Sequence, residues 1–248
     1  MPAQHSFDRL ARRLALALHR FTRIRLRGVT AGPAAALDDE VVGASALPGV
    51  GWVVGMAACL SLAIVSVALR ASSWNPAVAA IASTVVTVLL TGALHEIGFA
   101  RTVDRIASPA ASPHAATLAL VLLLAGKLAL LGLLATASAA TLMATLFAAH
   151  VVSRYAPLLV ADWLRAGTRL DRAALRRSAL WCVVPLLLMV LAGGVAAMLL
   201  ALIAGALGTA VLLRLGGDTL RDFDDDALGA VQQVCELAFY AGAALAVA

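Results

Sequence analysis

Two short acidic segments, far apart in the chain, carry the side chains best suited to metal-assisted chemistry. Residues 95–104 hold His95, Glu96 and Asp104, and residues 222–226 hold four aspartates. Proteins bind Mg²⁺ through one or two carboxylates together with the phosphate oxygens of a substrate. The ion neutralises charge that develops between attacking and leaving oxygens during phosphoryl transfer. The residues alone leave two interpretations open, a Mg²⁺ site for a diphosphate or a pair of solvated acidic loops.

Four further ionisable side chains stand inside long apolar runs, namely Lys127, His150, Arg154 and Glu236. A charge in the centre of a bilayer costs about 2.5–3.5 kcal/mol on insertion scales, so each of them needs an explanation. Lys127 either snorkels to the headgroups or faces the bundle interior, where it would meet an anionic substrate or a carboxylate. Arg154 shares a helix face with His150 and either snorkels or binds phosphate. Glu236 could pair with Lys127 or with Arg154.

The elements that must position these residues are transmembrane helices. A helix needs about 20 apolar residues to cross a bilayer. The apolar runs of that order cover residues 49–69, 76–94, 115–134, 137–160, 178–213 and 227–248. The run 178–213 is too long for one crossing, and a split near Gly193-Gly194 or Gly205 makes it a hairpin. We therefore expect an all-α polytopic membrane bundle of about seven transmembrane helices.

The composition excludes a water-soluble globular protein. Apolar residues make up 62% of the 248 residues and charged residues only 13%, against about 25% charged in soluble domains. No soluble fold hides so much apolar surface. Cys59, Cys182 and Cys235 fall in predicted spans without Cys-x-x-Cys spacing, so we expect small apolar residues rather than a disulfide or metal site.

The Lys and Arg residues predict the orientation, because cytoplasmic loops collect them. They concentrate in residues 1–48, 95–114, 161–177 and 214–226. Seven spans with a cytoplasmic N-terminus place all four segments inside, whereas a single crossing by 178–213 would move 214–226 outside. We expect a multi-pass protein of a bacterial inner (plasma) membrane, with the lipid bilayer as partner. The basic charge needs no nucleic acid to explain it.

The N-terminal segment, residues 1–48, is predicted to be cytoplasmic and to precede a transmembrane domain over 49–248. Apolar side chains recur in it at helical spacing, with arginines between them: Phe7, Leu10, Leu14, Leu18 and Phe21. This pattern predicts an amphipathic helix on the inner leaflet, and the alternative is a solvated Arg-rich segment.

The chain resembles the membrane-bound cobalamin synthases, adenosylcobinamide-GDP ribazoletransferases, over most of its length. Residues 226–230, Asp-Ala-Leu-Gly-Ala, resemble the family's Gly-Asp-x-Leu-Gly-Ala, and residues 21–24, Phe-Thr-Arg-Ile, resemble its Phe-Thr-Arg-Ile-Pro. Residues 91–96 resemble the lead-in to the signature His-x-Asp-Gly-x-x-Asp-x-x-Asp-Gly. Lys127 and the segment around His150 also match family positions.

The signature itself is altered in this chain. His95, Gly98 and Asp104 match it, but Ile97 and Arg101 stand where the family has aspartate. Arg105 replaces the last glycine of the signature. If the family's carboxylates hold Mg²⁺, Arg101 adds positive charge where the ion should sit.

The resemblance implies a transferase that joins adenosylcobinamide-GDP to α-ribazole or its 5′-phosphate and releases GMP, with Mg²⁺ as cofactor. We expect Glu96 to serve as a further catalytic carboxylate and third metal ligand, in compensation for the missing aspartates. The resemblance implies His95 and Asp104 as catalytic residues and Asp104 and Asp226 as metal ligands. It also implies phosphate contacts from Arg23, Lys127 and Arg154.

Two other functions stay open at this stage. The lost aspartates favour a catalytically degenerate homologue that binds corrinoid or a pathway partner. The intramembrane residues Lys127, His150, Arg154 and Glu236 would also suit the relay of a transporter. The sequence is also compatible with a homo-oligomer.

Overall fold

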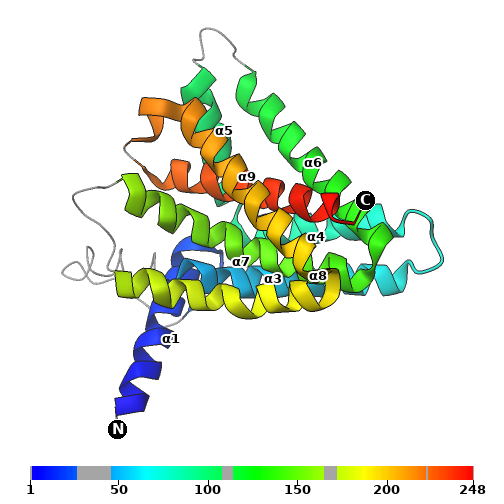
Figure 1. Cartoon of the computed structure of the whole chain (residues 1–248), viewed down its shortest axis with the longest axis horizontal. Helices are drawn as coiled ribbons and strands as arrows, with labels where there is room; N and C mark the ends of the chain where they lie inside the picture. Colours follow the sequence, from blue (N-terminus) through cyan, green and yellow to red (C-terminus); the bar gives the residue numbers. More distant parts are fainter. Residues whose placement is uncertain (1, 27–45, 108–113, 165–171, 222, 248) are drawn as a thin grey trace.

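The computed structural model describes residues 2–26, 46–107, 114–164, 172–221 and 223–247, with side chains from residue 10 onward. These residues are almost entirely helical and contain no strand. The helices, in chain order, are α1 (Pro2–Phe21), α3 (Leu47–Ala68), α4 (Asn75–Thr91), α5 (Leu94–Ala107), α6 (Ala115–Ala137), α7 (Ala139–Leu164), α8 (Arg172–Gly216), the short 3₁₀ turn η1 (Gly217–Leu220) and α9 (Asp225–Leu245) (Figure 1).

The predicted all-α multi-pass membrane bundle is confirmed. Four helical segments in the described parts are long and apolar enough to cross a membrane: α3, α6, α7 and the segment Arg172–Leu220. The bent pair of α4 and α5 makes a fifth if it counts as one span. This count is lower than the seven spans expected from the sequence.

The difference in count arises where helices bend or carry polar side chains. Helix α8 breaks at Gly194 (φ 83°, ψ 169°), one of the predicted split points, yet it counts as one continuous segment. Only glycine adopts this backbone readily. Figure 1 shows the two arms of α8 as a V. The helix α9, predicted as the last span, carries Gln232, Gln233 and Glu236 and is not among the apolar candidates.

Apolar side chains on the outside of the bundle fit contact with lipid. Along α3, Met56, Leu60 and Ile64 recur every fourth residue and are each about 60% exposed. In water such a stripe would oppose folding, but against acyl chains it costs nothing. Helix α7 lies inside, with most of its length buried.

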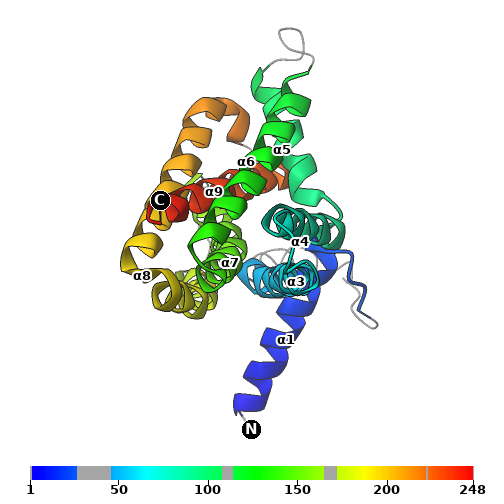
Figure 2. The same cartoon turned by 90° about the vertical axis from the view of Figure 1, so that its right-hand side faces the viewer.

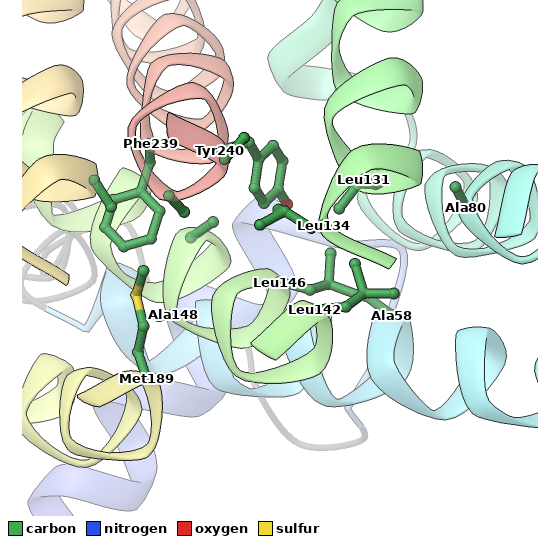
Figure 3. Packing of buried hydrophobic residues seen from close by; sticks show 14 of the residues in the cluster. Ala58, Ala80, Leu131, Leu134, Leu142, Leu146, Ala148, Met189, Phe239 and Tyr240 are labelled. Atoms are coloured by element: carbon green, nitrogen blue, oxygen red, sulfur yellow. The ribbon is translucent and has the colours of Figure 1, made fainter. Parts of the chain in front are cut away.

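The core of the bundle packs around α7 and α9. Leu142 and Leu146 of α7 meet Leu131 and Leu134 of α6 on one side, and Met189 of α8 approaches Phe239 of α9 on the other (Figure 3). This packing brings polar residues of α6, α7 and α9 together at one depth of the bundle.

The predicted N-terminal helix is present as α1. It runs across the bundle rather than along it, and its beginning projects away from the other helices in both views (Figures 1 and 2). Its last turns bury Ala17 and Phe21 against Leu47, Val50 and Val54. The side chain of Phe7 and residues 27–45 of the predicted N-terminal segment lie outside the description. Contact of α1 with the inner leaflet stays a prediction.

Candidate functional site

A small cavity of about 20 Å³ lies inside the bundle between α4, α5, α6, α7 and α9, which is room for about one water molecule. We call it the polar cavity, because most of its lining side chains are polar. They are Ser83, Thr84, Thr87, Thr91, His95, Glu96, Lys127, His150, Arg154, Gln232, Gln233, Glu236 and Tyr240. Polar groups buried this deeply require partners within the protein or a ligand, because each loses its contact with water.

A sharp bend between α4 and α5 brings His95 and Glu96 to this cavity. The two helices meet at 86°. Gly92 and Ala93 adopt left-handed backbone conformations with φ of 68° and 59°. For alanine this conformation costs roughly 1–2 kcal/mol. The bend turns α5 across the N-terminal part of α9.

Helices α5 and α9 cross at two glycines. A Cβ atom on Gly229 would lie 3.0 Å from the carbonyl oxygen of His95, and one on Gly98 would lie 2.9 Å from the carbonyl oxygen of Asp226. The two backbones are therefore in direct contact, which fixes where His95 and Glu96 sit relative to α9.

Lys127 and Glu236 form a buried ion pair, with 2.9 Å between Nζ and Oε1. Both side chains are only about 5% exposed. The structure thus settles two questions that the sequence left open: Lys127 faces the interior, and the pairing partner of Glu236 is Lys127. The hydroxyl of Tyr240 also donates to Oε1 of Glu236, at 3.3 Å.

Gln233 links this pair to Glu96. Its Oε1 accepts a hydrogen bond from Lys127 Nζ, and its Nε2 donates to Oε1 of Glu96 at 3.0 Å. Because the amide has one accepting and one donating end, Lys127 dictates which end faces Glu96. The second oxygen of Glu96 and both ring nitrogens of His95 have no hydrogen-bond partner among the described residues. An unpaired carboxylate oxygen and an unpaired imidazole ring therefore line the polar cavity.

Arg154 and His150 of α7 line another part of the polar cavity. Arg154 is 1% exposed, so it does not snorkel, and it donates to the carbonyl oxygen of His150 at 2.8 Å. Its Nε has no partner among the described residues. The ring of His150 lies 3.6 Å from Glu236. Arg154 thus keeps one N–H available for an anionic group.

The acidic end of α9 lies outside the polar cavity and is tied by arginines of other helices. Arg20 of α1 pairs with Asp225 at 2.9 Å, and Arg105 of α5 pairs with Asp224 at 2.7 Å. Asp226 lies 3.5 Å from Arg101 and 3.9 Å from Arg105. We call this set the Arg–Asp cluster.

The Arg–Asp cluster also caps α9. Asp224 is the N-cap residue and accepts a hydrogen bond from the backbone N–H of Ala227. The hydrogen bond from Arg105 lowers the pKa of Asp224 below its ordinary value. The negative charges also suit the positive end of the helix dipole.

The three predicted metal ligands do not come together. In the described part of the chain no three His, Cys, Asp or Glu side chains are grouped so that they could hold a metal ion. Glu96 lines the polar cavity, Asp226 is paired with arginines, and Asp104 is half-buried on α5. This arrangement does not fit a Mg²⁺ ion held by these three carboxylates. Asp222 lies outside the description.

Of the other predicted site residues, four meet in the polar cavity: His95, Glu96, Lys127 and Arg154. Arg23 does not line the cavity. It is exposed beside the bend, where its backbone N–H donates to Leu90 and its side chain covers Gly92. Phe21 nearby stacks on the ring of His95, with 6.4 Å between centroids.

The sequence analysis assigned no site role to Gln233 or Tyr240. Both lie on the face of α9 that carries Glu236, at spacings of three and four residues. Reading along that helix face from the intramembrane glutamate would have found them.

Comparison with known proteins gives one family and no solved structure. Residues 13–244 match the family described as cobalamin-5-phosphate synthase. A protein named adenosylcobinamide-GDP ribazoletransferase from Albidiferax ferrireducens is 34% identical, over 94% of this chain and 98% of its own length. Proteins of the same name from a Polaromonas species and from Ralstonia nicotianae are 32% and 34% identical, over 96% and 91% of this chain and 98% and 92% of their own lengths. No solved structure matches the chain.

Proposed function

The chain belongs to the cobalamin-5-phosphate synthase family, and we propose that it is an adenosylcobinamide-GDP ribazoletransferase. It would join adenosylcobinamide-GDP to α-ribazole or its 5′-phosphate and release GMP. The similarity over nearly the whole length of the relatives supports this proposal. The observation that carries the chemistry is Glu96, which accepts a hydrogen bond from Gln233 and keeps one carboxylate oxygen free in the cavity that His95 also lines; Lys127 in turn orients Gln233.

In the proposed reaction a ribose hydroxyl of α-ribazole attacks the phosphorus that is linked to the corrinoid. A new P–O bond forms, the P–O bond to GMP breaks, and GMP leaves with the bridging oxygen. The hydroxyl proton passes to Glu96 or, through it, to His95, as general-base catalysis requires. Arg154 faces the phosphate with its free Nε–H, and Lys127 keeps Glu96 in place.

The polar cavity must widen before substrates enter, because it now holds only about one water molecule. Its polar wall is contributed partly by α5, which begins at the strained Gly92-Ala93 bend. A Mg²⁺ requirement stays a prediction.

We further propose that the protein lies in a bacterial inner membrane with the Arg–Asp cluster on the cytoplasmic side. Helix α7 ends, and α8 and α9 begin, at one side of the bundle (Figure 1). Basic residues at these ends favour the cytoplasmic face. The pairing of Arg20 with Asp225 supports a position of the end of α1 on the same side of the membrane as the Arg–Asp cluster.

A GMP-release assay with adenosylcobinamide-GDP, α-ribazole and Mg²⁺ tests the proposed reaction. Replacing Glu96 by Gln removes the base but keeps the shape, so we expect kcat to fall by about 10²–10⁴. Asp162→Asn, outside the polar cavity, is the matched control and should retain activity. Folded wild-type protein that releases no GMP would overturn the proposal, and full activity of Glu96→Gln would overturn the role of Glu96.

One observation favours the degenerate homologue that binds corrinoid or a pathway partner. Arg101 and Arg105, which stand at altered signature positions, both pair with aspartates of α9 and so neutralise carboxylates that would otherwise attract a cation. Complementation of a bacterium that lacks its own cobalamin synthase separates the two. Only an active transferase restores growth on cobinamide.

A further inference from the structure

Two further cavities, which adjoin along α8, share no lining residue with the polar cavity. The first, of about 510 Å³, is lined by α7, α9 and both arms of α8, and its lining is mainly apolar. Its larger aliphatic and aromatic side chains include Tyr155, Leu159, Leu186, Leu202 and Phe239. We call it the apolar cavity.

The other cavity of this pair, of about 630 Å³, lies where α8 ends. Its charged and aromatic lining residues are Trp163, Arg214, Asp218 and Arg221. We call it the basic cavity. Ala210 and Leu213 line both cavities, so the two adjoin along one face of α8.

From this arrangement we infer that the joined cavities bind one anionic phospholipid. One of its acyl chains occupies the apolar cavity and its phosphate lies at Arg214 in the basic cavity. The site differs from the general lipid-facing surface because it is recessed between helices and ends at a cationic side chain.

The length of the recess fits a single leaflet. The lining residues from Leu202 of α8 to Gly217, the first residue of η1, cover about 22 Å at about 1.5 Å per residue. Half of a bilayer, headgroups included, is about 20–22 Å thick. One lipid can therefore reach from the inside of the V to the end of α8.

Charge complementarity indicates an anionic headgroup. Arg221 is already paired with Asp218 at 2.8 Å. Within the described ranges Arg214 has no carboxylate at ion-pair distance, so the basic cavity keeps one net positive charge. Trp163 beside it is 70% exposed, as is common for tryptophan at the headgroup level of membrane proteins.

The lipid site is independent of the polar cavity because the two use different faces of α9. Cys235 and Phe239 line the apolar cavity, whereas Glu236 and Tyr240 line the polar one. Figure 3 shows Phe239 on the side of α9 toward α8 and Tyr240 on the side toward α6. The inference therefore does not rest on the proposed reaction.

Native mass spectrometry of the purified full chain, mixed with equal amounts of phosphatidylglycerol and phosphatidylcholine, tests the site. We expect wild-type protein to retain one phosphatidylglycerol in preference to phosphatidylcholine. Ala210→Trp blocks the point where the cavities join and should abolish retention. Val211→Trp, which alters an exposed neighbour outside both cavities, should not.

A second pair of variants tests the headgroup contact without filling either cavity. Arg214→Gln should weaken phosphatidylglycerol binding about fivefold, the value of one arginine near an anionic headgroup. Arg70→Gln, an exposed arginine that lines neither cavity, should leave it unchanged. Equal retention of both lipids by wild-type protein, or equal effects of Arg214→Gln and Arg70→Gln, would overturn the inference. Unchanged retention by folded Ala210→Trp would do so as well.

Discussion

Two regions of α9 hold charge in opposite ways. At the polar cavity, Lys127 and Glu236 pair where almost no solvent reaches, and Gln233 extends the network to Glu96. At the start of the helix, three aspartates pair with arginines that remain a third or more exposed. Buried charges depend entirely on their partners, whereas water and salt can replace a partner at the surface. Removing one member of the buried network should therefore destabilise the protein strongly, whereas removing one member of the Arg–Asp cluster should destabilise it little.

The largest expected effect follows from removing Lys127. Lys127→Met leaves Glu236 buried without its counter-ion, and we expect a loss of about 3–5 kcal/mol in stability. Thermal unfolding in detergent, followed by size-exclusion chromatography, measures it. The double variant Lys127→Met with Glu236→Leu should recover most of this loss, since no unpaired charge remains. A single variant as stable as wild type would show that the pair is not desolvated.

Breaking the link to Glu96 should cost less stability and more activity. Gln233→Leu leaves Oε1 of Glu96 without its hydrogen-bond donor, and we expect a loss of about 1–3 kcal/mol in stability. Because the base loses its orientation, kcat for GMP release should fall at least tenfold with KM little changed. A rise in KM alone would indicate that Gln233 contacts substrate instead.

The glycine crossing between the two regions should be similarly sensitive. Gly229→Ala places a methyl group against the backbone of His95 and should destabilise the protein by about 1–3 kcal/mol. Gly132→Ala is the matched control, because a Cβ there meets nothing within 4 Å. The control should be neutral or slightly stabilising through helix propensity. Equal stabilities of the two variants would contradict the close contact of α5 and α9.

The Arg–Asp cluster should give the smallest effects, and they should depend on pH and salt. Arg105→Gln should cost about 0.2–1 kcal/mol at low salt and less at high salt. Because Arg105 lowers the pKa of Asp224 in the folded protein, the stabilisation is present at neutral pH. This stabilisation is lost as the pH falls below 3.8, the ordinary pKa of an aspartate, and then through the lower pKa of Asp224 in the folded protein. Unfolding of wild type and Asp224→Asn across this range checks the sign, since their difference should vanish in acid.

Several parts of the site were open to prediction from particular residues. Lys127, Arg154 and Glu236 were singled out because a charge in an apolar run needs a partner, and all three meet in the polar cavity. The break of α8 at Gly194 was expected because 178–213 is too long for one crossing. The bend after α4 was not expected, because it requires a left-handed backbone conformation at Ala93 that alanine rarely adopts.

The sequence by itself determined the helical membrane fold and the family, since a bilayer accepts only long apolar helices and the matching motifs stand in the chain as written. Only the tertiary structure decided which charges meet. Arg101 and Arg105 cover the aspartates of α9, and Gln233 reaches Glu96 more than a hundred residues away. Such pairings depend on where helices cross, and the crossing of α5 and α9 is set by contact between two backbones, which no local pattern of residues encodes.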